Sequence, residues 1–159
     1  MTGWEHDPVT ALVELKGYTN PPMGFEVGVL PNAQDYPENE GAFLSGAESS
    51  VALIATVHEL GLNDMPKREW LKKSILHNEK KITAMMKEVL DKSGDNVPRR
   101  RLLMGVMGDM TAELIQQSVL RDQLELPSNS ATTLARKQGS VPMVDTGHLI
   151  SVIDSEVVG

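Results

Sequence analysis

The chain of 159 residues contains no cysteine. It therefore has no disulfide bond, no thiolate metal ligand and no cysteine nucleophile. Aromatic residues make up only 4% of the chain, whereas methionine occurs nine times. We therefore expect a core built mainly from Leu, Val, Ile, Ala and Met side chains. Met also suits surfaces that repack against partners.

Long apolar runs are missing as well. No segment approaches the roughly 18 apolar residues of a transmembrane helix, and the first ten residues lack the basic and apolar regions of a secretory signal. The sequence thus predicts no membrane partner. Its length fits one domain, and its hydrophobic fraction of 40% is ordinary for a globular protein.

Charge is distributed unevenly. Residues 1–60 contain nine acidic residues and one basic residue, whereas residues 61–159 contain thirteen acidic and fourteen basic residues. Nucleic-acid-binding proteins usually have a basic face, which the net charge of −7 does not favour. The asymmetry is typical of a solvated acidic surface, and it would also help subunits to stack in one direction.

The first third of the chain predicts one strand and one short helix. Residues 1–24, broken by Gly17 and a Pro pair, are interpreted as an N-terminal arm outside the core. Residues 25–30 alternate as a strand, and residues 31–50 are interpreted as a long surface loop of the kind that is usually functional or disordered. In a scaffold protein, that function would be contact with a neighbour. Residues 51–60 favour a helix, capped by Ser49 or Ser50 and ended by Gly61.

Two long helices are predicted next. In the first, at 67–92, an apolar stripe recurs at helical spacing, and the sequence after it stops the helix before Pro98 opens the second. The second runs to about Arg121, and its glycines permit close helix approach. The predicted stripes are Leu71, Ile75, Ile82, Met86 and Val89 in the first helix, and Leu103, Met107, Met110, Leu114 and Gln117 in the second.

The C-terminal region predicts a final strand at about 150–158. With the strand at 25–30 and the helical hairpin, it gives an α+β domain over residues 25–159. We expect a small antiparallel or mixed sheet packed against the long helical hairpin.

Asp145-Thr146-Gly147 has the letters of an aspartic-protease motif. That chemistry needs two carboxylates that share a proton, which a homodimer would supply. Such a loop must be followed by a flap and most of a β-barrel, but only twelve residues follow Gly147. We therefore favour a capped turn, in which Asp145 caps and Gly147 makes the bend.

Other candidate chemistry is sparse. Arg99-Arg100-Arg101 begins a helix, where the helix dipole disfavours cations, so it is a solvated run, a contact to acidic residues of a neighbour, or a contact to DNA. No phosphate-binding loop is present, and no histidines stand at metal-ligand spacing, so we expect no enzyme activity, cofactor or metal. The histidines are His6, His58, His77 and His148.

Several short motifs occur in a fixed order: VGVLP at 27–31, VHELG at 57–61, MPKREWL at 65–71 and PMVDTGHLISVI at 142–153. Before the last of these stand Leu126-Pro127, a threonine at 132 or 133 and a basic pair at 136–137. In this order the chain resembles the tail-completion and virion-morphogenesis proteins of lambda-like and Mu-like phages. Glu69 replaces the family's usual second Pro, Trp70 replaces its Phe, and Ser151 falls one place early.

The resemblance implies a virion protein, assembled in the host cytoplasm, that forms a homo-oligomeric ring, commonly hexameric, at the head–tail junction. Its implied neighbours are the connector or adaptor and the tail terminator or tail tube, with genomic DNA passing through the lumen without sequence-specific binding.

Arg68 and Trp70 would lock the start of the first long helix, and residues 142–153 would fix the final strand near the subunit interface. The structural or interface candidates are Pro66, Arg68, Trp70, Arg99, Arg100, Arg101, Asp145, Thr146, Gly147 and Leu149. The alternatives are a homodimeric aspartic protease and a DNA-contacting accessory protein.

Overall fold

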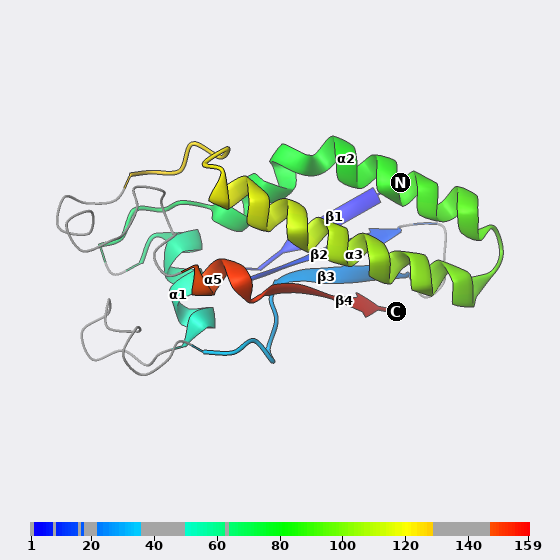
Figure 1. Cartoon of the computed structure of the whole chain (residues 1–159), viewed down its shortest axis with the longest axis horizontal. Coiled ribbons are helices and arrows are strands. Elements are labelled where there is room, and N and C mark those ends of the chain that lie inside the picture. The colour runs from blue at the N-terminus through cyan, green and yellow to red at the C-terminus, as the bar shows by residue number, and fades with distance from the viewer. Residues whose placement is uncertain are drawn as a thin grey trace.

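In the computed structural model, the described residues are 2–7, 9–15, 17, 22–35, 50–62, 64–128 and 147–159. Within them, one antiparallel sheet has the order β1-β2-β3-β4, and two long helices lie side by side over one of its faces (Figure 1). This confirms the predicted α+β class. The elements are β1 (Thr2–His6), β2 (Thr10–Leu15), β3 (Gly24–Val29), α1 (Val51–Leu60), α2 (Trp70–Ser93), α3 (Val97–Leu120), α5 (His148–Ser151) and β4 (Ile153–Val158).

The prediction of an arm at 1–24 needs correction. β2 lies inside the sheet between β1 and β3, and its register pairs Val13 with Phe25. Ala11, Val13 and Leu15 alternate at the strand period of two, and all three are buried. The turn residues that follow connect two paired strands, so they do not separate an arm from the domain.

Helix α1 has the predicted bounds because both of its ends are capped. The Ser50 hydroxyl accepts the Leu53 N–H at 3.2 Å, and this satisfies a backbone donor that the first helical turn leaves open. Gly61 adopts a left-handed backbone with φ of 72°, which costs a glycine little, and donates to the Val57 carbonyl. The Ser50 alternative for the cap is therefore confirmed.

Helices α2 and α3 form the predicted hairpin, and the predicted stripe of α2 is buried in full. The turn ends at Asn96, whose side chain accepts the Arg99 N–H at 2.9 Å, with Pro98 in the first turn of α3. Inside the helix pair, Asn78 donates to the Ser118 hydroxyl at 2.9 Å. This buried bond joins the two helices and meets the hydrogen-bonding need of a polar group inside the core.

The predicted stripe of α3 is only partly correct: Met107 is buried and Leu103 is partly buried against the core, Leu114 and Gln117 are partly buried, and Met110 is exposed. The buried residues of this helix are Arg100, Met104, Met107, Gly108, Thr111, Ala112, Ile115, Ser118 and Val119, whereas Met110 is 49% exposed. Apolar side chains occur all round α3, so hydrophobic spacing alone does not identify its inner side. Small residues on that side, such as Gly108, are what allow the close packing.

Gly108 brings α3 close to the sheet, whereas sequence analysis expected its glycines to bring helices together. A Cβ at this position would lie 2.7 Å from the Ser155 hydroxyl of β4 and 3.0 Å from its Cβ. At Gly105, one turn earlier, the nearest atom would be a Val157 methyl carbon at 3.6 Å, which is an ordinary contact. Gly108 therefore sets the spacing between helix and strand.

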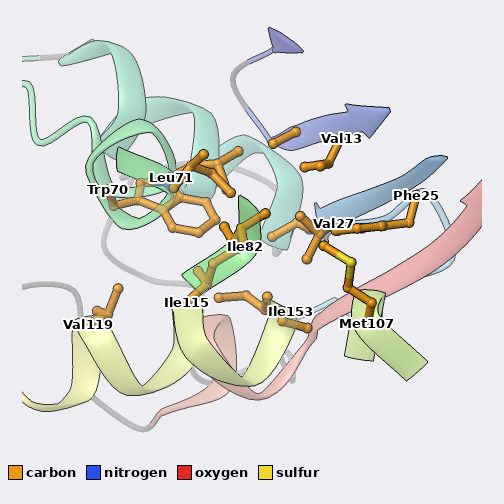
Figure 2. Packing of buried hydrophobic residues seen from close by; sticks show 14 of the residues in the cluster. Val13, Phe25, Val27, Trp70, Leu71, Ile82, Met107, Ile115, Val119 and Ile153 are labelled. Carbon is orange, nitrogen blue, oxygen red and sulfur yellow. The ribbon is translucent and has the colours of Figure 1, made fainter. Parts of the chain in front are cut away.

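The core lies between the hairpin and the inner face of the sheet. Figure 2 shows Phe25 and Val27 of β3 near Met107 of α3, with Ile82 and Ile115 between the layers. Full burial of such a side chain contributes about 1.5–3 kcal/mol. Since residues of β2, β3, β4 and the helices all belong to one buried cluster, the described elements share a single core.

The final strand begins later than predicted. His148–Ser151 form the short helix α5, and β4 begins at Ile153. Leu149 and Ile150 are both buried, which strict strand alternation would not allow. Gly147 adopts φ of 82° just before α5, as a tight bend requires.

Candidate functional site

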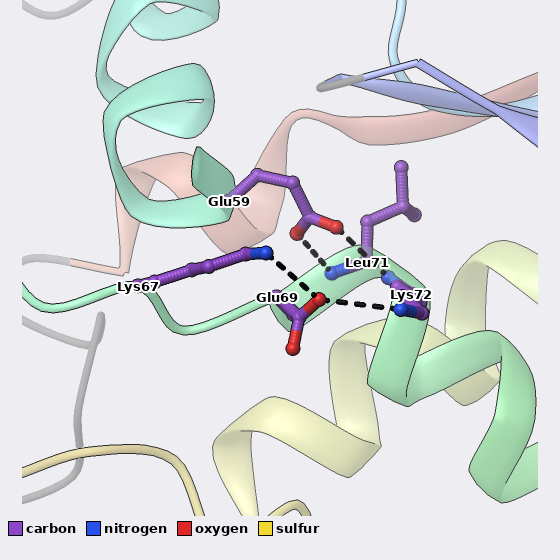
Figure 3. Close-up of polar contacts among 5 residues, drawn as sticks. All are labelled: Glu59, Lys67, Glu69, Leu71 and Lys72. Atoms are coloured by element: carbon purple, nitrogen blue, oxygen red, sulfur yellow. Dashed lines mark hydrogen bonds and ion pairs between the residues drawn. The ribbon is translucent and has the colours of Figure 1, made fainter. Parts of the chain in front are cut away.

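The corner between α1 and α2 is built around a buried carboxylate. Glu59 is 2% exposed, and its two oxygens accept the backbone N–H groups of Leu71 at 2.9 Å and Lys72 at 3.3 Å (Figure 3). These donors belong to the first turn of α2, where no helical carbonyl is available to them. Glu59 thus acts as a long-range cap and favourably places a negative charge at the positive end of α2.

Arg68 fastens the same corner from the other side. It is 1% exposed; its Nη1 donates to the Nδ1 of His58 at 2.7 Å, and its Nε donates to the Pro127 carbonyl at 3.2 Å. Because arginine has no acceptor atom, Nδ1 of His58 must be unprotonated. Burial lowers the pKa of the Arg68 guanidinium, although arginine stays charged at physiological pH. The side chain therefore ties α1 to the segment after α3.

Trp70 is the first residue of α2 and is fully buried, and its indole Nε1 donates to the Ala55 carbonyl at 3.0 Å. The predicted role of Arg68 and Trp70, which was to lock the start of the long helix, agrees with these contacts. Pro66 is exposed on the approach to the helix. The corner is a structural joint, and its buried groups face protein atoms.

Glu69 stands beside the joint with a left-handed backbone at φ of 51°. Its carboxylate is 3.3 Å from the ammonium groups of both Lys67 and Lys72 (Figure 3). The hydrogen bond from Lys72, and then that from Lys67, lowers the pKa of this carboxyl. These contacts are largely exposed to solvent, so they contribute modestly to stability.

The three arginines of α3 differ in their surroundings. The Arg100 side chain is buried and donates to the Ser93 hydroxyl at 3.2 Å and to the Gly94 carbonyl, so it closes the end of α2. Arg101 donates to the Gly159 carbonyl, and Arg99 is exposed. The three arginines therefore do not form the single run that the sequence predicts, because their positions on the helix direct them to different environments.

The protease-like motif is described only at its last residue. Asp145 and Thr146 lie outside the described residues, whereas Leu149 is buried in the core and the His148 ring is 2.8 Å from the Gln34 carbonyl. In Figure 1, α5 lies beside α1 at one end of the molecule. The turn between α2 and α3 lies at the opposite end. The described C-terminal candidates and the arginine run therefore belong to separate regions.

A feature that sequence analysis missed is the outer face of α3, defined here by Leu102, Val106 and Met110. These side chains are 70%, 52% and 49% exposed, at four-residue steps along one side of the helix. Val106 precedes the buried Ile115 by nine residues, which is about two and a half turns at about 100° per residue. The two side chains therefore lie on opposite sides of the helix, and this face points away from the core. Apolar residues all round an otherwise two-sided helix were the available signal.

A groove of about 420 Å³ runs beside this face, between α2 and α3. Ala84 and Met85 of α2 and Met110 and Leu114 of α3 make it mostly apolar, with Lys81 and Glu113 at its rim. Together with the outer face of α3, the groove extends the exposed apolar surface from α3 onto α2. Grooves of this kind commonly accept a helix or an apolar side chain from a partner.

The sheet face that the helices do not cover is acidic. Glu26 of β3 pairs directly with Glu156 of β4, and Gly28 pairs with Asp154. Asp154 and Glu156 are exposed, whereas Glu26 is partly buried. Like charges opposite one another weaken a strand pair, so sheet stability does not explain this face. The molecule thus presents two unlike surfaces on opposite sides.

Comparisons with known proteins identify no relative. No family model, curated protein or solved structure matches the chain. Among the residues described, no three His, Asp or Glu side chains form a group that would hold a metal ion, and no helix has both the length and the apolarity to cross a membrane.

Proposed function

We propose that the chain is a non-enzymatic structural subunit of a tailed-phage virion, which assembles into a ring at the head–tail junction and joins the capsid connector to the tail. The single observation that carries the proposal is the outer face of α3. Leu102, Val106 and Met110 place apolar side chains in water along one line of a well-packed helix. Exposed apolar surface of this kind marks an interaction site, as an assembling subunit requires.

A ring needs two different surfaces that fit one another, because each copy contacts the next head to tail. The outer face of α3 with its groove supplies one such surface, and the open sheet face with Glu26, Asp154 and Glu156 supplies a surface of different character. Complementary potentials guide such contacts and fix their direction. The partly exposed Lys72 and Lys73 near the start of α2 are suitable partners for an acidic neighbour.

The phage assignment depends on the order of the sequence motifs, and the contacts at the α1–α2 corner are compatible with it. Arg68 and Trp70, which stand in the motif at 65–71, are buried structural residues. Such residues are expected to persist in a family that keeps the fold, whereas the surfaces adapt to different neighbours. The proposed neighbours are a connector or adaptor and a tail terminator or tail tube protein.

The rival functions have less support. A DNA-contacting role would use the arginine run, but Arg100 is buried and engaged with Ser93 and Gly94. For the protease, Asp145→Asn gives a direct test: it would abolish a protease, whereas a structural subunit carrying it should still assemble. DNA contact would appear as salt-dependent DNA retention that weakens when Arg99 is replaced by Ala.

The proposal is tested by complementing a phage that lacks this gene with Val106→Arg, which places a cation in the apolar face. We expect a folded protein, by circular dichroism, that fails to join heads to tails and lowers the titre at least a hundredfold. Leu76→Arg, at a similarly exposed residue of α2, should complement normally. A wild-type chain that is strictly monomeric and missing from purified particles would disprove the proposal.

A further inference from the structure

The outer face of α3 is complementary to itself when the helix is turned end for end. Arg99, Leu102, Val106, Met110 and Glu113 follow one another at steps of three, four, four and three residues. These steps keep all five on one side of a helix with 3.6 residues per turn. The series is symmetric about Val106, with an apolar residue four positions away and a charged residue seven positions away on each side.

The charges at the two ends are opposite. Arg99 and Glu113 are both exposed, and in an antiparallel pair of α3 helices each Arg99 would face Glu113 of the second copy. At the same time Leu102 would face Met110, and Val106 would face its own counterpart. We propose that two copies of this chain pair through α3 in this antiparallel, two-fold arrangement.

The pairing accounts for two features that the isolated subunit leaves unexplained. Arg99 stands near the positive end of the α3 dipole, where a cation is unfavourable, and Glu113 of the second copy would offset that charge. Leu102, which at 70% is the most exposed large apolar side chain among the described residues, would be covered beside Met110 at the edge of the α2–α3 groove. In the pair, the charge of Arg99 is offset and Leu102 is covered, and neither effect needs a change in the fold.

The pair should be reversible. A contact made by one helix from each copy buries less than the roughly 1,600 Å² of a standard stable interface. The dissociation constant is therefore expected in the micromolar range, with a dimer fraction that depends on concentration. A two-fold contact is complete with two copies and cannot extend into a ring by itself.

The two-fold pair has a consequence for ring assembly, and this consequence rests on the proposed function. If the ring uses the outer face of α3, a chain paired through α3 cannot enter it, so pairing keeps free subunits from assembling before a connector is present. The pairing is measured on the purified chain, whereas the ring is measured in purified particles. Failure of one proposal is therefore distinguishable from failure of the other.

The decisive experiment uses the absence of cysteine from the chain. In the antiparallel pair a residue at position 106 meets its own counterpart, so Val106→Cys should form a disulfide-linked dimer on mild oxidation of the purified full chain. Leu102→Cys and Met110→Cys should each stay unlinked alone but link when mixed, because only unlike positions meet. Leu76→Cys, away from this face, is the matched control. A disulfide requires Cα atoms within about 7 Å of one another, so positions that face each other in the pair should link faster than the collisional background that Leu76→Cys measures.

Charge reversal supplies an independent arm. Arg99→Glu and Glu113→Arg should each weaken dimerisation roughly tenfold by sedimentation equilibrium, because each places like charges together, and the double variant should restore it. The inference is overturned if Val106→Cys links no faster than Leu76→Cys, or if the double variant is as weak as the single ones. A wild-type chain that sediments only as a monomer or only as a ring would also overturn it.

Discussion

The carboxylate of Glu59, one residue before the end of α1, accepts the backbone N–H of Leu71 in the first turn of α2 at 2.9 Å. A side chain twelve positions earlier in the sequence thus replaces the local cap that α2 lacks, since Glu69 makes no capping bond of its own. The start of α2 therefore depends on the position of α1.

Removal of this carboxylate should destabilise the whole domain. Glu59→Ala leaves buried N–H groups without an acceptor, and we expect a loss of about 2–3 kcal/mol, or roughly 4–12 °C in the midpoint of thermal unfolding. Glu59→Gln keeps one oxygen and should lose about half as much. Circular dichroism on heating measures both, and equal midpoints for the two variants would show that the bonds to α2 are unimportant.

Trp70 gives a second test of the same corner. Trp70→Phe removes the indole bond to the Ala55 carbonyl while it keeps an aromatic ring, so we expect a loss of about 1–2 kcal/mol. Trp70→Ala should cost about 3–5 kcal/mol because it also leaves a cavity. Urea unfolding provides the free energies. A Phe variant as unstable as the Ala variant would mean that the hydrogen bond, and not ring packing, dominates.

The two glycines of α3 should respond in opposite directions. Gly108→Ala forces a methyl group against Ser155 and should cost about 1–3 kcal/mol. Gly105→Ala, whose Cβ would make only an ordinary contact with a Val157 methyl carbon, should stabilise the helix by up to about 1 kcal/mol. Chemical denaturation of both variants compares one substitution at two sites on a single helix. A stabilised Gly108→Ala variant would show that the helix and strand are not in close contact.

The Glu69 carboxyl should make the folding stability depend slightly on pH. Its pKa is lowered in the folded chain by the hydrogen bonds from Lys72 and Lys67, so its contribution is present above the ordinary carboxyl pKa of 4.5 and is lost as the pH falls through the lower folded value. Glu69→Gln should therefore reduce stability at pH 7 by less than about 1 kcal/mol. The difference from wild type should shrink towards zero in acid and in high salt. A difference that persists in acid would assign the effect to backbone strain at this residue.

Much of the helical architecture was predictable because its determinants are local. Ser50, Gly61, Asn96 and Pro98 are end signals that act within one turn, and the stripe of α2 repeats without interruption. The position of Arg68 and Trp70 at the start of α2 followed from the resemblance. Their actual partners, His58, Ala55 and the Pro127 carbonyl, were not predictable, because tertiary packing brings those atoms together.

The incorrect predictions for the N-terminal arm and for the inner side of α3 also arise from tertiary packing. The N-terminal arm was an incorrect interpretation because a short alternating segment such as residues 11–15 is identified as a strand only once its partner is known. The inner side of α3 was misassigned because Met110 and Met107 are equally apolar, and only the contact of Gly108 with Ser155 decides which side faces the sheet. The outer face of α3, which carries the proposals, was missed for that reason.

The pairing of β3 with β4 also governs the order in which the molecule can form. Gly24 is the partner of Val158, so these two neighbouring strands come from segments of the chain between which α1, α2 and α3 lie in the sequence. Closing such a long loop costs chain entropy before any contact repays it. We therefore expect the helical hairpin to form early as a local unit and the sheet to gain its last strand late in folding. Until then the edge of β3 would be open to other chains.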